Sequence, residues 1–87
     1  MMQLSQMPNI GPVLAGHLSQ SGIQSGEELC ALGAEQAFLR LRERQPDACF
    51  HTLTALEGAV RGARKTQLSQ ERKKQLRQFF EGLPGAE

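Results

Sequence analysis

The chain has 87 residues, which is the size of one small domain. Hydrophobic residues make up 39% of it and glycines add to them, as in ordinary globular proteins, so extended disorder and collagen-like repeats are excluded. No apolar run has the length of a membrane span, and the first residues lack the features of a signal peptide. We therefore expect one cytoplasmic domain that is too small to enclose a large catalytic cleft.

The net charge of +1 hides an uneven distribution along the chain. Residues 1–60 carry three basic and six acidic side chains, whereas residues 61–77 carry seven basic side chains and one acid. A basic segment of this kind can meet a polyanion or an acidic protein face, and it is also typical of a solvated helix surface. The charge pattern leaves both alternatives open.

Helix signals occur along the whole chain. Pro12 is suited to the first position of a helix, Asp47 is a good helix cap, and Gly82 followed by Pro84 ends the last helix. Val, Ile and Thr never alternate over a strand-length window, which argues against strands. The predicted helices lie within residues 12–21, 25–33, 34–46, 47–62 and 69–82. We therefore predict an all-α fold, a compact bundle of five short helices.

The fourth predicted helix should hold the centre of the core, because its apolar residues repeat at helical spacing. The predicted core consists of Leu14, Leu18, Leu32, Phe38, Leu41, Leu53, Leu56, Leu76 and Phe80. Small residues on the same helix would let a neighbour approach closely, and we take Gly58, Ala59 and Gly62 as candidates for an interaction surface. Glu57 beside them is either a buried acid that contacts a partner or, as we favour, an i,i+4 partner of Arg61.

The sequence contains no group of residues that indicates a catalytic site or a metal site. Cys30 and Cys49 are far apart, and we expect both to be reduced and mostly buried among apolar neighbours. The zinc-ligand spacing of His and Cys residues is absent. No nucleophile, base and orienting group can be assigned from the sequence. We therefore expect no enzymatic activity, no metal and no cofactor.

The segment from Met7 to Ile23 carries the most informative local pattern. A tight turn at Asn9, Ile10 and Gly11 leads directly into a helix, and successive backbone N–H groups in such a turn can form an anion-binding nest. These residues resemble the helix-hairpin-helix motif, which contacts the nucleic-acid backbone. Asn9 stands where that motif usually has its first glycine. Just after the hairpin, the chain has Val13, Ala15 and Gly16 where DNA-binding members usually have Lys or Arg.

Four short motifs occur in the order PNIGP, Leu-Gly-Ala-Glu from Leu32, Ala-Leu-Glu-Gly from Ala55 and Glu-Arg-Lys from Glu71. From Met7 to Phe80 this series resembles the C-terminal domain of the TfoX/Sxy family of bacterial competence regulators. The chain departs from that pattern at Thr54 and Lys65, where the family tends to have aromatic residues. The usual N-terminal α/β domain is absent here, so the resemblance leaves open whether the chain works alone or with a separate domain of that type.

The resemblance implies one domain over residues 1–87, with tails at residues 1–6 and 83–87, and a helix-hairpin-helix or SAM-like fold. It also implies a non-enzymatic regulatory module that contacts a protein of a transcriptional regulatory system, or nucleic acid, with no membrane association. A homodimer and the target promoter stay open. The alternative is a helix-hairpin-helix module that binds the DNA backbone without sequence preference. The candidate phosphate contacts are Asn9, Ile10, Gly11, Arg64, Lys65, Arg72, Lys73, Lys74 and Arg77.

Overall fold

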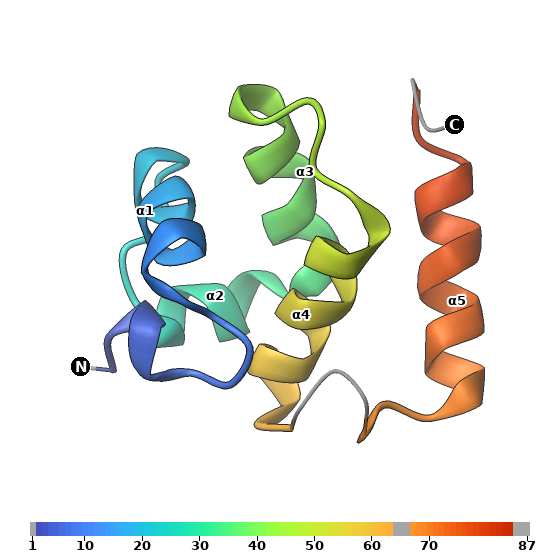
Figure 1. Ribbon diagram of the computed structural model, residues 1–87, viewed down its shortest axis with the longest axis horizontal. Coiled ribbons are helices and arrows are strands. Elements are labelled where there is room, and N and C mark those ends of the chain that lie inside the picture. Colours follow the sequence, from blue (N-terminus) through green and yellow to red (C-terminus); the bar gives the residue numbers. More distant parts are fainter. Residues whose placement is uncertain (1, 64–66, 85–87) are drawn as a thin grey trace.

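The computed structural model describes residues 2–63 and 67–84, and these residues form five α-helices, one 3-10 turn and no strand. The elements are η1 (Leu4–Gln6), α1 (Pro12–Gln20), α2 (Gly26–Leu32), α3 (Ala34–Arg44), α4 (Phe50–Arg61) and α5 (Gln70–Glu81) (Figure 1). The all-α prediction of five short helices in one compact bundle is confirmed. Within the described ranges, no helix is long and apolar enough to cross a membrane.

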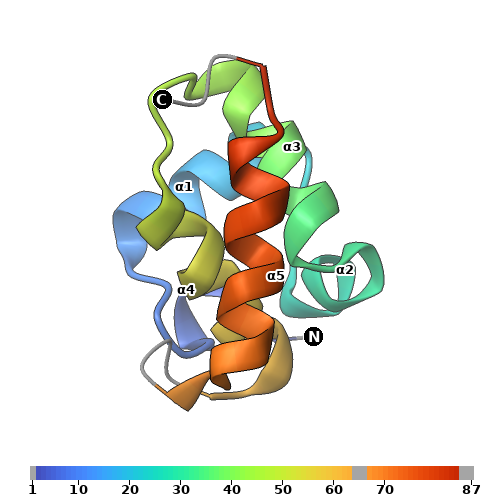
Figure 2. The same ribbon diagram turned by 90° about the vertical axis from the view of Figure 1, so that its right-hand side faces the viewer.

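The pairing of α3 with α4 forms the centre of the bundle. Helices α1 and α2 and the turn η1 lie on one side of α4, and α5 lies on its other side (Figure 1). Turned by a quarter, the molecule shows α5 running in front of α3 and α4 (Figure 2). Helix α4 is therefore the element against which both ends of the chain are assembled.

The core contains most of the residues predicted for it. Six of them are buried: Leu18, Phe38, Leu41, Leu53, Leu56 and Leu76. Three others are partly buried and pack against the core: Leu14, Leu32 and Phe80. Helix periodicity therefore identified the contact faces of α1, α3, α4 and α5 correctly.

Both predicted tails contribute to the packing. Leu4 of η1 is buried, so residues 2–6 are not the tail that we expected. At the other end, Leu83 packs against the core, and Arg42 Nη2 donates a hydrogen bond of 2.9 Å to the carbonyl oxygen of Pro84. Residues 85–87 of the predicted C-terminal tail lie outside the described residues. The folded unit thus extends to both ends of the described chain.

Helix α4 begins later than predicted, because Asp47 is not its cap. The N–H of Ala48 donates to the carbonyl oxygen of Gln45 at 2.9 Å, which closes a turn with Pro46 and Asp47 at its centre. Proline favours the second position of such a turn. Cys49 therefore becomes the N-cap residue, and the helix starts at Phe50.

The prediction of two buried cysteines is wrong: Cys30 and Cys49 are both exposed, and both are unpaired thiols. Cys49 stands before the first residue of α4, so it does not continue the apolar stripe of that helix. Cys30 follows Leu29, the residue that α2 turns into the core, and successive residues of a helix point in different directions. Proximity to leucines in the sequence therefore misled the prediction.

Candidate interaction surfaces

The hairpin before α1 is a tight turn from Met7 to Ile10. Its closing hydrogen bond runs from the N–H of Ile10 to the carbonyl oxygen of Met7, at 3.3 Å. Asn9 has a positive φ of 68°, which Asn tolerates better than most residues. Gly11, by contrast, has an ordinary φ of −88° and is the N-cap of α1. The strained position of the hairpin is therefore Asn9, where the resembled motif has a glycine.

The side chain of Asn9 is turned toward the protein. Its Nδ2 donates to the carbonyl oxygens of Ala63, at 3.0 Å, and of Ala55, at 3.4 Å. Met7 and Ile10 are buried beneath the turn. Any contact of the hairpin with a phosphate would consequently use backbone N–H groups, including those of the first turn of α1, which have no intrahelical acceptor.

Arg72, one of the candidate phosphate contacts, lies at the centre of an ion network. Its Nε is 2.9 Å from Oε2 of Glu57, and its Nη2 is 3.0 Å from Oε1 of the same carboxylate. The same Nη2 is 2.9 Å from Oε1 of Glu35. Because the side chain of Arg72 is 19% exposed and bonded to two acids, its charge is neutralised within the protein.

Glu57 is the buried partner of this network, with a side chain that is 5% exposed. It also forms the predicted i,i+4 pair with Arg61. Hydrogen bonds from Arg72 hold the pKa of the Glu57 carboxyl below its ordinary value, although burial alone would raise it. The same bonds raise the pKa of Arg72. The network joins α3, α4 and α5, and its role is therefore to hold these three helices together.

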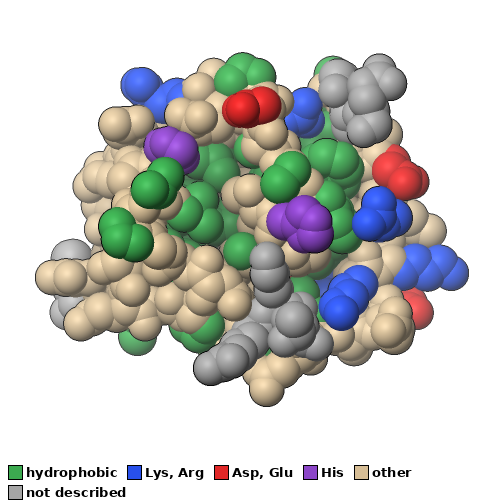
Figure 3. All heavy atoms as spheres, viewed as in Figure 1, with side chains coloured by type: hydrophobic (Ala, Val, Ile, Leu, Met, Phe, Trp, Pro, Cys, Tyr) green, Lys and Arg blue, Asp and Glu red, His purple; other side chains and the backbone are tan. Residues whose placement is uncertain are grey.

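The other described cations of α5 point outward. Lys74 and Arg77 are exposed, Lys73 is half-buried, and the guanidinium of Arg77 lies 4.2 Å from the centre of the Phe50 ring. Lys and Arg side chains gather over α5, at the right-hand edge of the molecule (Figure 3). The two remaining candidates, Arg64 and Lys65, lie outside the described residues.

The hairpin lies on one side of α4, and helix α5, which carries these cations in its sequence, lies on the other side (Figure 1). Within residues 2–63 and 67–84, the fold therefore does not gather the predicted phosphate contacts into one surface. Asn9 does touch the chain at Ala63, which immediately precedes Arg64 in the sequence.

Gly58 and Ala59 do not form an exposed surface, because both are buried inside the bundle. Gly62 is exposed, and its φ of 72° ends α4 in the left-handed conformation. The N–H of Ala63 then donates to the carbonyl oxygen of Gly58 at 2.8 Å, as in a Schellman motif. These small residues serve packing and helix termination within the chain.

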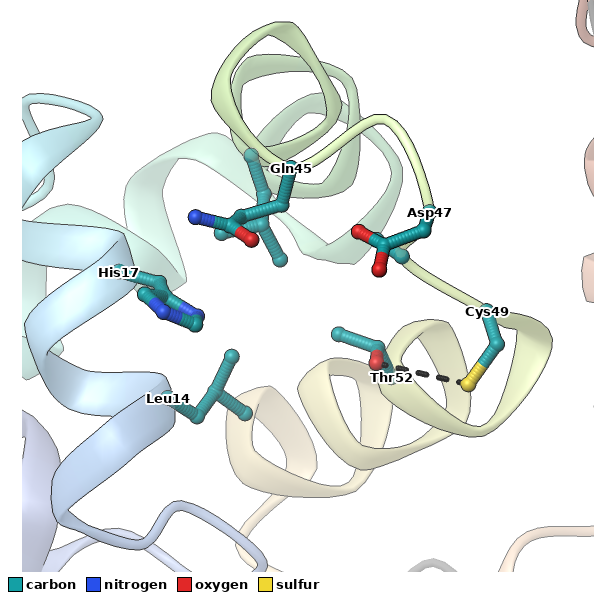
Figure 4. A pocket seen from close by; sticks show the side chains of 8 residues that line it. Leu14, His17, Gln45, Asp47, Cys49 and Thr52 are labelled. Atoms are coloured by element: carbon teal, nitrogen blue, oxygen red, sulfur yellow. Dashed lines mark hydrogen bonds between the residues drawn. The ribbon is translucent and has the colours of Figure 1, made fainter.

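A cavity of about 220 Å³, which sequence reasoning missed, opens between α1, the end of α3 and the start of α4. Its lining residues are Leu14, His17, Leu41, Gln45, Asp47, Ala48, Cys49 and Thr52. The side chains from α1 face those of the α3–α4 connection across the open space (Figure 4). Val13, adjacent to this wall in the sequence, is 72% exposed. The cavity depends on the Pro46–Asp47 turn, whose position the helix prediction had misplaced.

Cys49 stands at one end of this cavity, with its Sγ 3.8 Å from Oγ1 of Thr52. The backbone N–H of Thr52 lowers the pKa of the Cys49 thiol, because an N–H in the first turn of a helix stabilises the thiolate. No group of three or more His, Cys, Asp or Glu residues among the described residues is arranged to hold a metal ion. The cavity thus offers mixed apolar and polar contacts.

These features define a small all-α domain. Residues 1–80 match the TfoX C-terminal domain family, and the chain belongs to that family. Among curated proteins, it is 31% identical over 81 residues to Protein Sxy of Escherichia coli (strain K12), covering 93% of this chain. The match spans 39% of Protein Sxy, so the chain corresponds to about two fifths of that relative.

Two solved structures share the fold closely. An uncharacterized protein from Listeria monocytogenes, in a triclinic crystal form, is 43% identical, with a TM-score of 0.92 over 94% of this chain and 93% of that chain. A protein of unknown function from Listeria monocytogenes, in a tetragonal form, is 42% identical, with a TM-score of 0.91 over 93% of this chain and 100% of that one. The family resemblance read from the sequence motifs is therefore confirmed.

Proposed function

We propose that the chain is a non-enzymatic regulatory module that acts in the cytoplasm, through contacts with a protein partner, in the transcriptional control of competence. Membership of the TfoX C-terminal domain family supports the regulatory role. Protein Sxy is more than twice as long as the matched region, so in that relative the domain is joined to further chain.

The observation that favours a protein partner is the exposed apolar surface on α1. Val13 is one of two large hydrophobic side chains that the described residues leave exposed, and it precedes Leu14, which lines the cavity described above. Exposed apolar surface rimmed by polar groups is typical of protein interaction sites. Arg72, one of the candidate phosphate contacts, is meanwhile bonded within the chain.

A reporter for a competence gene, in cells that depend on this protein for its expression, tests the proposal. Val13→Glu should abolish reporter activity while leaving the folded protein intact, because the side chain is 72% exposed. Gln78→Glu is the matched control, since it adds the same single negative charge on the exposed face of α5. If Val13→Glu retained full activity and Gln78→Glu lost it, the protein-contact surface on α1 would be refuted.

Non-specific binding to the DNA backbone is the second candidate. It is favoured by the hairpin contact with Ala63, next to the basic residues 64 and 65 of the sequence. We expect weak binding, with a dissociation constant of about 10⁻⁵ M or higher at physiological salt. If several phosphates are neutralised, log affinity should fall with log salt by roughly 0.9 per phosphate.

A titration with short duplexes at low and moderate salt decides between the two. Gly11→Val is a suitable variant, because a Cβ at Gly11 would meet nothing within 4 Å and the fold should be kept. Lys73→Glu combined with Lys74→Glu tests the basic face of α5. Tight binding that both changes abolish would favour the DNA-binding function over the protein-contact function.

A further inference from the structure

The cavity between α1 and the α3–α4 connection has an apolar inner wall. Leu41, which is 1% exposed, lines it from the side of the core. Leu14 and Ala48 also line it, and both are partly buried against the hydrophobic core. A side chain that enters the cavity can therefore contact residues that belong to the core or pack against it.

The volume of the cavity, about 220 Å³, suits a single large side chain. Pockets that hold small-molecule ligands are larger, at roughly 300–1,000 Å³, and they cover most of the ligand surface. At protein interfaces, by contrast, a few anchor residues that fill pockets provide most of the binding energy. The size of the cavity therefore favours an anchor residue of a partner protein over a whole small molecule.

Val13 extends the apolar surface of α1 beside the cavity. It lies four residues before His17, which lines the cavity, so the two side chains are neighbours on one face of the helix. The Val13 side chain is 72% exposed. A partner whose anchor residue occupies the cavity would consequently cover Val13 as well.

The polar rim of the cavity carries a carboxylate. Asp47 is exposed, and it takes part in none of the ion pairs formed among residues 2–63 and 67–84. Among the described residues, no Lys or Arg lines the cavity. His17 lies across the open space from Asp47 (Figure 4). A cation of the partner would thus meet an unpaired carboxylate beside an apolar pocket, which is complementary in charge.

We propose that the cavity binds a protein segment in which a large apolar side chain stands close to a Lys or Arg. The apolar side chain fills the space against Leu41, the cation pairs with Asp47, and the rest of the segment covers Val13. An acidic segment is disfavoured, because its charge would face the same carboxylate. This inference rests on the proposed function, since it gives the chemistry of the partner that the α1 surface contacts.

Selection of phage-displayed random dodecapeptides on the folded chain tests the partner chemistry. The selected peptides should share a large apolar residue within a few positions of a Lys or Arg. For a synthetic copy of such a peptide, Asp47→Asn should weaken binding by about threefold, because it removes one exposed charge pair. Glu71→Gln is the matched control: it removes one negative charge from an exposed position on α5, and it should bind the peptide as the parent does.

The two cysteines report where the peptide binds. Both thiols are exposed and unpaired, but Cys49 lines the cavity and Cys30 does not. The same synthetic peptide, at saturation, should protect Cys49 from alkylation by iodoacetamide and leave the alkylation rate of Cys30 unchanged. Each thiol thus serves as the internal control for the other in a single sample.

Several results would overturn the inference: a selection that enriches no peptide, selected peptides that are acidic or lack a large apolar residue, equal effects of Asp47→Asn and Glu71→Gln, or equal protection of Cys30 and Cys49. The reporter test with Val13→Glu separates this inference from the proposed function. If Val13→Glu abolishes reporter activity and one of these results occurs, the protein-contact function stands and the chemistry assigned to the partner is wrong.

Discussion

The hairpin and helix α5 both dock on α4, from opposite sides and through different chemistry (Figure 1). The hairpin is held by the buried Met7 and Ile10 and by the neutral amide of Asn9, which donates to backbone carbonyls. Helix α5 is held by the buried Leu76, by the ion network of Arg72, and by the ring contacts of Phe80 with Phe38 and Phe50. One side of α4 therefore accepts neutral hydrogen bonds, and the other side presents a buried carboxylate.

The difference matters because the two kinds of anchor respond to different conditions. A neutral amide bonded to carbonyls keeps its strength across the pH range and at high salt. A buried carboxylate paired with arginine is destabilised when either partner is lost, since the remaining charge is then buried without compensation. Docking of α5 should consequently depend on protonation, and docking of the hairpin should not.

The largest expected effect comes from the apolar contacts, which both sides share. Leu18 of α1 and Leu76 of α5 are both fully buried. Replacing either by Ala should lower the free energy of unfolding by about 2–5 kcal/mol, the range for deleting a buried leucine side chain. Urea unfolding followed by circular dichroism measures both. A much smaller loss for Leu76→Ala would show that α5 contributes little to the cooperative unit.

Arg72→Ala should have the next largest effect, because it leaves Glu57 buried with Arg61 as its remaining partner. We expect a loss of about 3 kcal/mol in the free energy of unfolding, the lower end of the range for breaking a buried ion pair. Lys74→Ala, on the exposed face of the same helix, should change it by less than about 0.5 kcal/mol. Equal effects of the two changes would contradict a special role for Arg72.

The pH dependence of stability tests the contribution of the Glu57 carboxylate separately. Arg72 holds the pKa of Glu57 in the folded protein below its ordinary value of 4.5. As the pH falls below that value, the unfolded chain takes up a proton before the folded chain does, and stability is lost. The contribution of the network is thus present above pH 4.5 and disappears as the pH falls through the folded-state pKa.

Urea unfolding of the parent and of Arg72→Ala over this range measures the effect. The difference between their unfolding free energies should shrink as the solution becomes acidic. A difference that stayed constant would mean that Arg72 stabilises the fold by packing, without its bonds to Glu57.

The fold could be predicted from the sequence because local rules agree with the tertiary structure. Serine is a favoured helix cap, and the hydroxyls of Ser25 and Ser69 each accept a hydrogen bond from the backbone N–H three residues later. Gly22 and Gly62 end their helices with positive φ. Apolar spacing then identified the faces that pack together. Prediction was less accurate where a turn competed with a cap, as at Asp47.

The candidate surfaces could be predicted less well, because exposure depends on contacts between residues far apart in the sequence. Arg72 lies in a basic run that is typical of a solvated face. Its side chain is nevertheless turned inward, where it donates hydrogen bonds to Glu57, fifteen residues earlier. Gly58 and Ala59 suggested close approach of a neighbour, and the chain's own packing buries them. The cavity beside α1 depends on a turn between two other helices, and no local sequence motif predicts that cavity.

Substitutions of Asn9 should have the smallest effect and complete the comparison. Asn9→Gly removes the hydrogen bonds to the carbonyl oxygens of Ala55 in α4 and of Ala63 beyond it, but it keeps access to positive φ, and we expect a loss of about 1 kcal/mol in the free energy of unfolding. Asn9→Ala also strains the backbone at a φ of 68°, so its loss should be larger, about 2 kcal/mol. Urea unfolding at neutral and acidic pH should give the same losses for each variant, since the amide of Asn9 and the carbonyl groups of Ala55 and Ala63 are neutral at both. A loss that disappeared in acid, as expected for Arg72→Ala, would show that the hairpin is coupled to the ion network through α4 and that the two anchors are not independent.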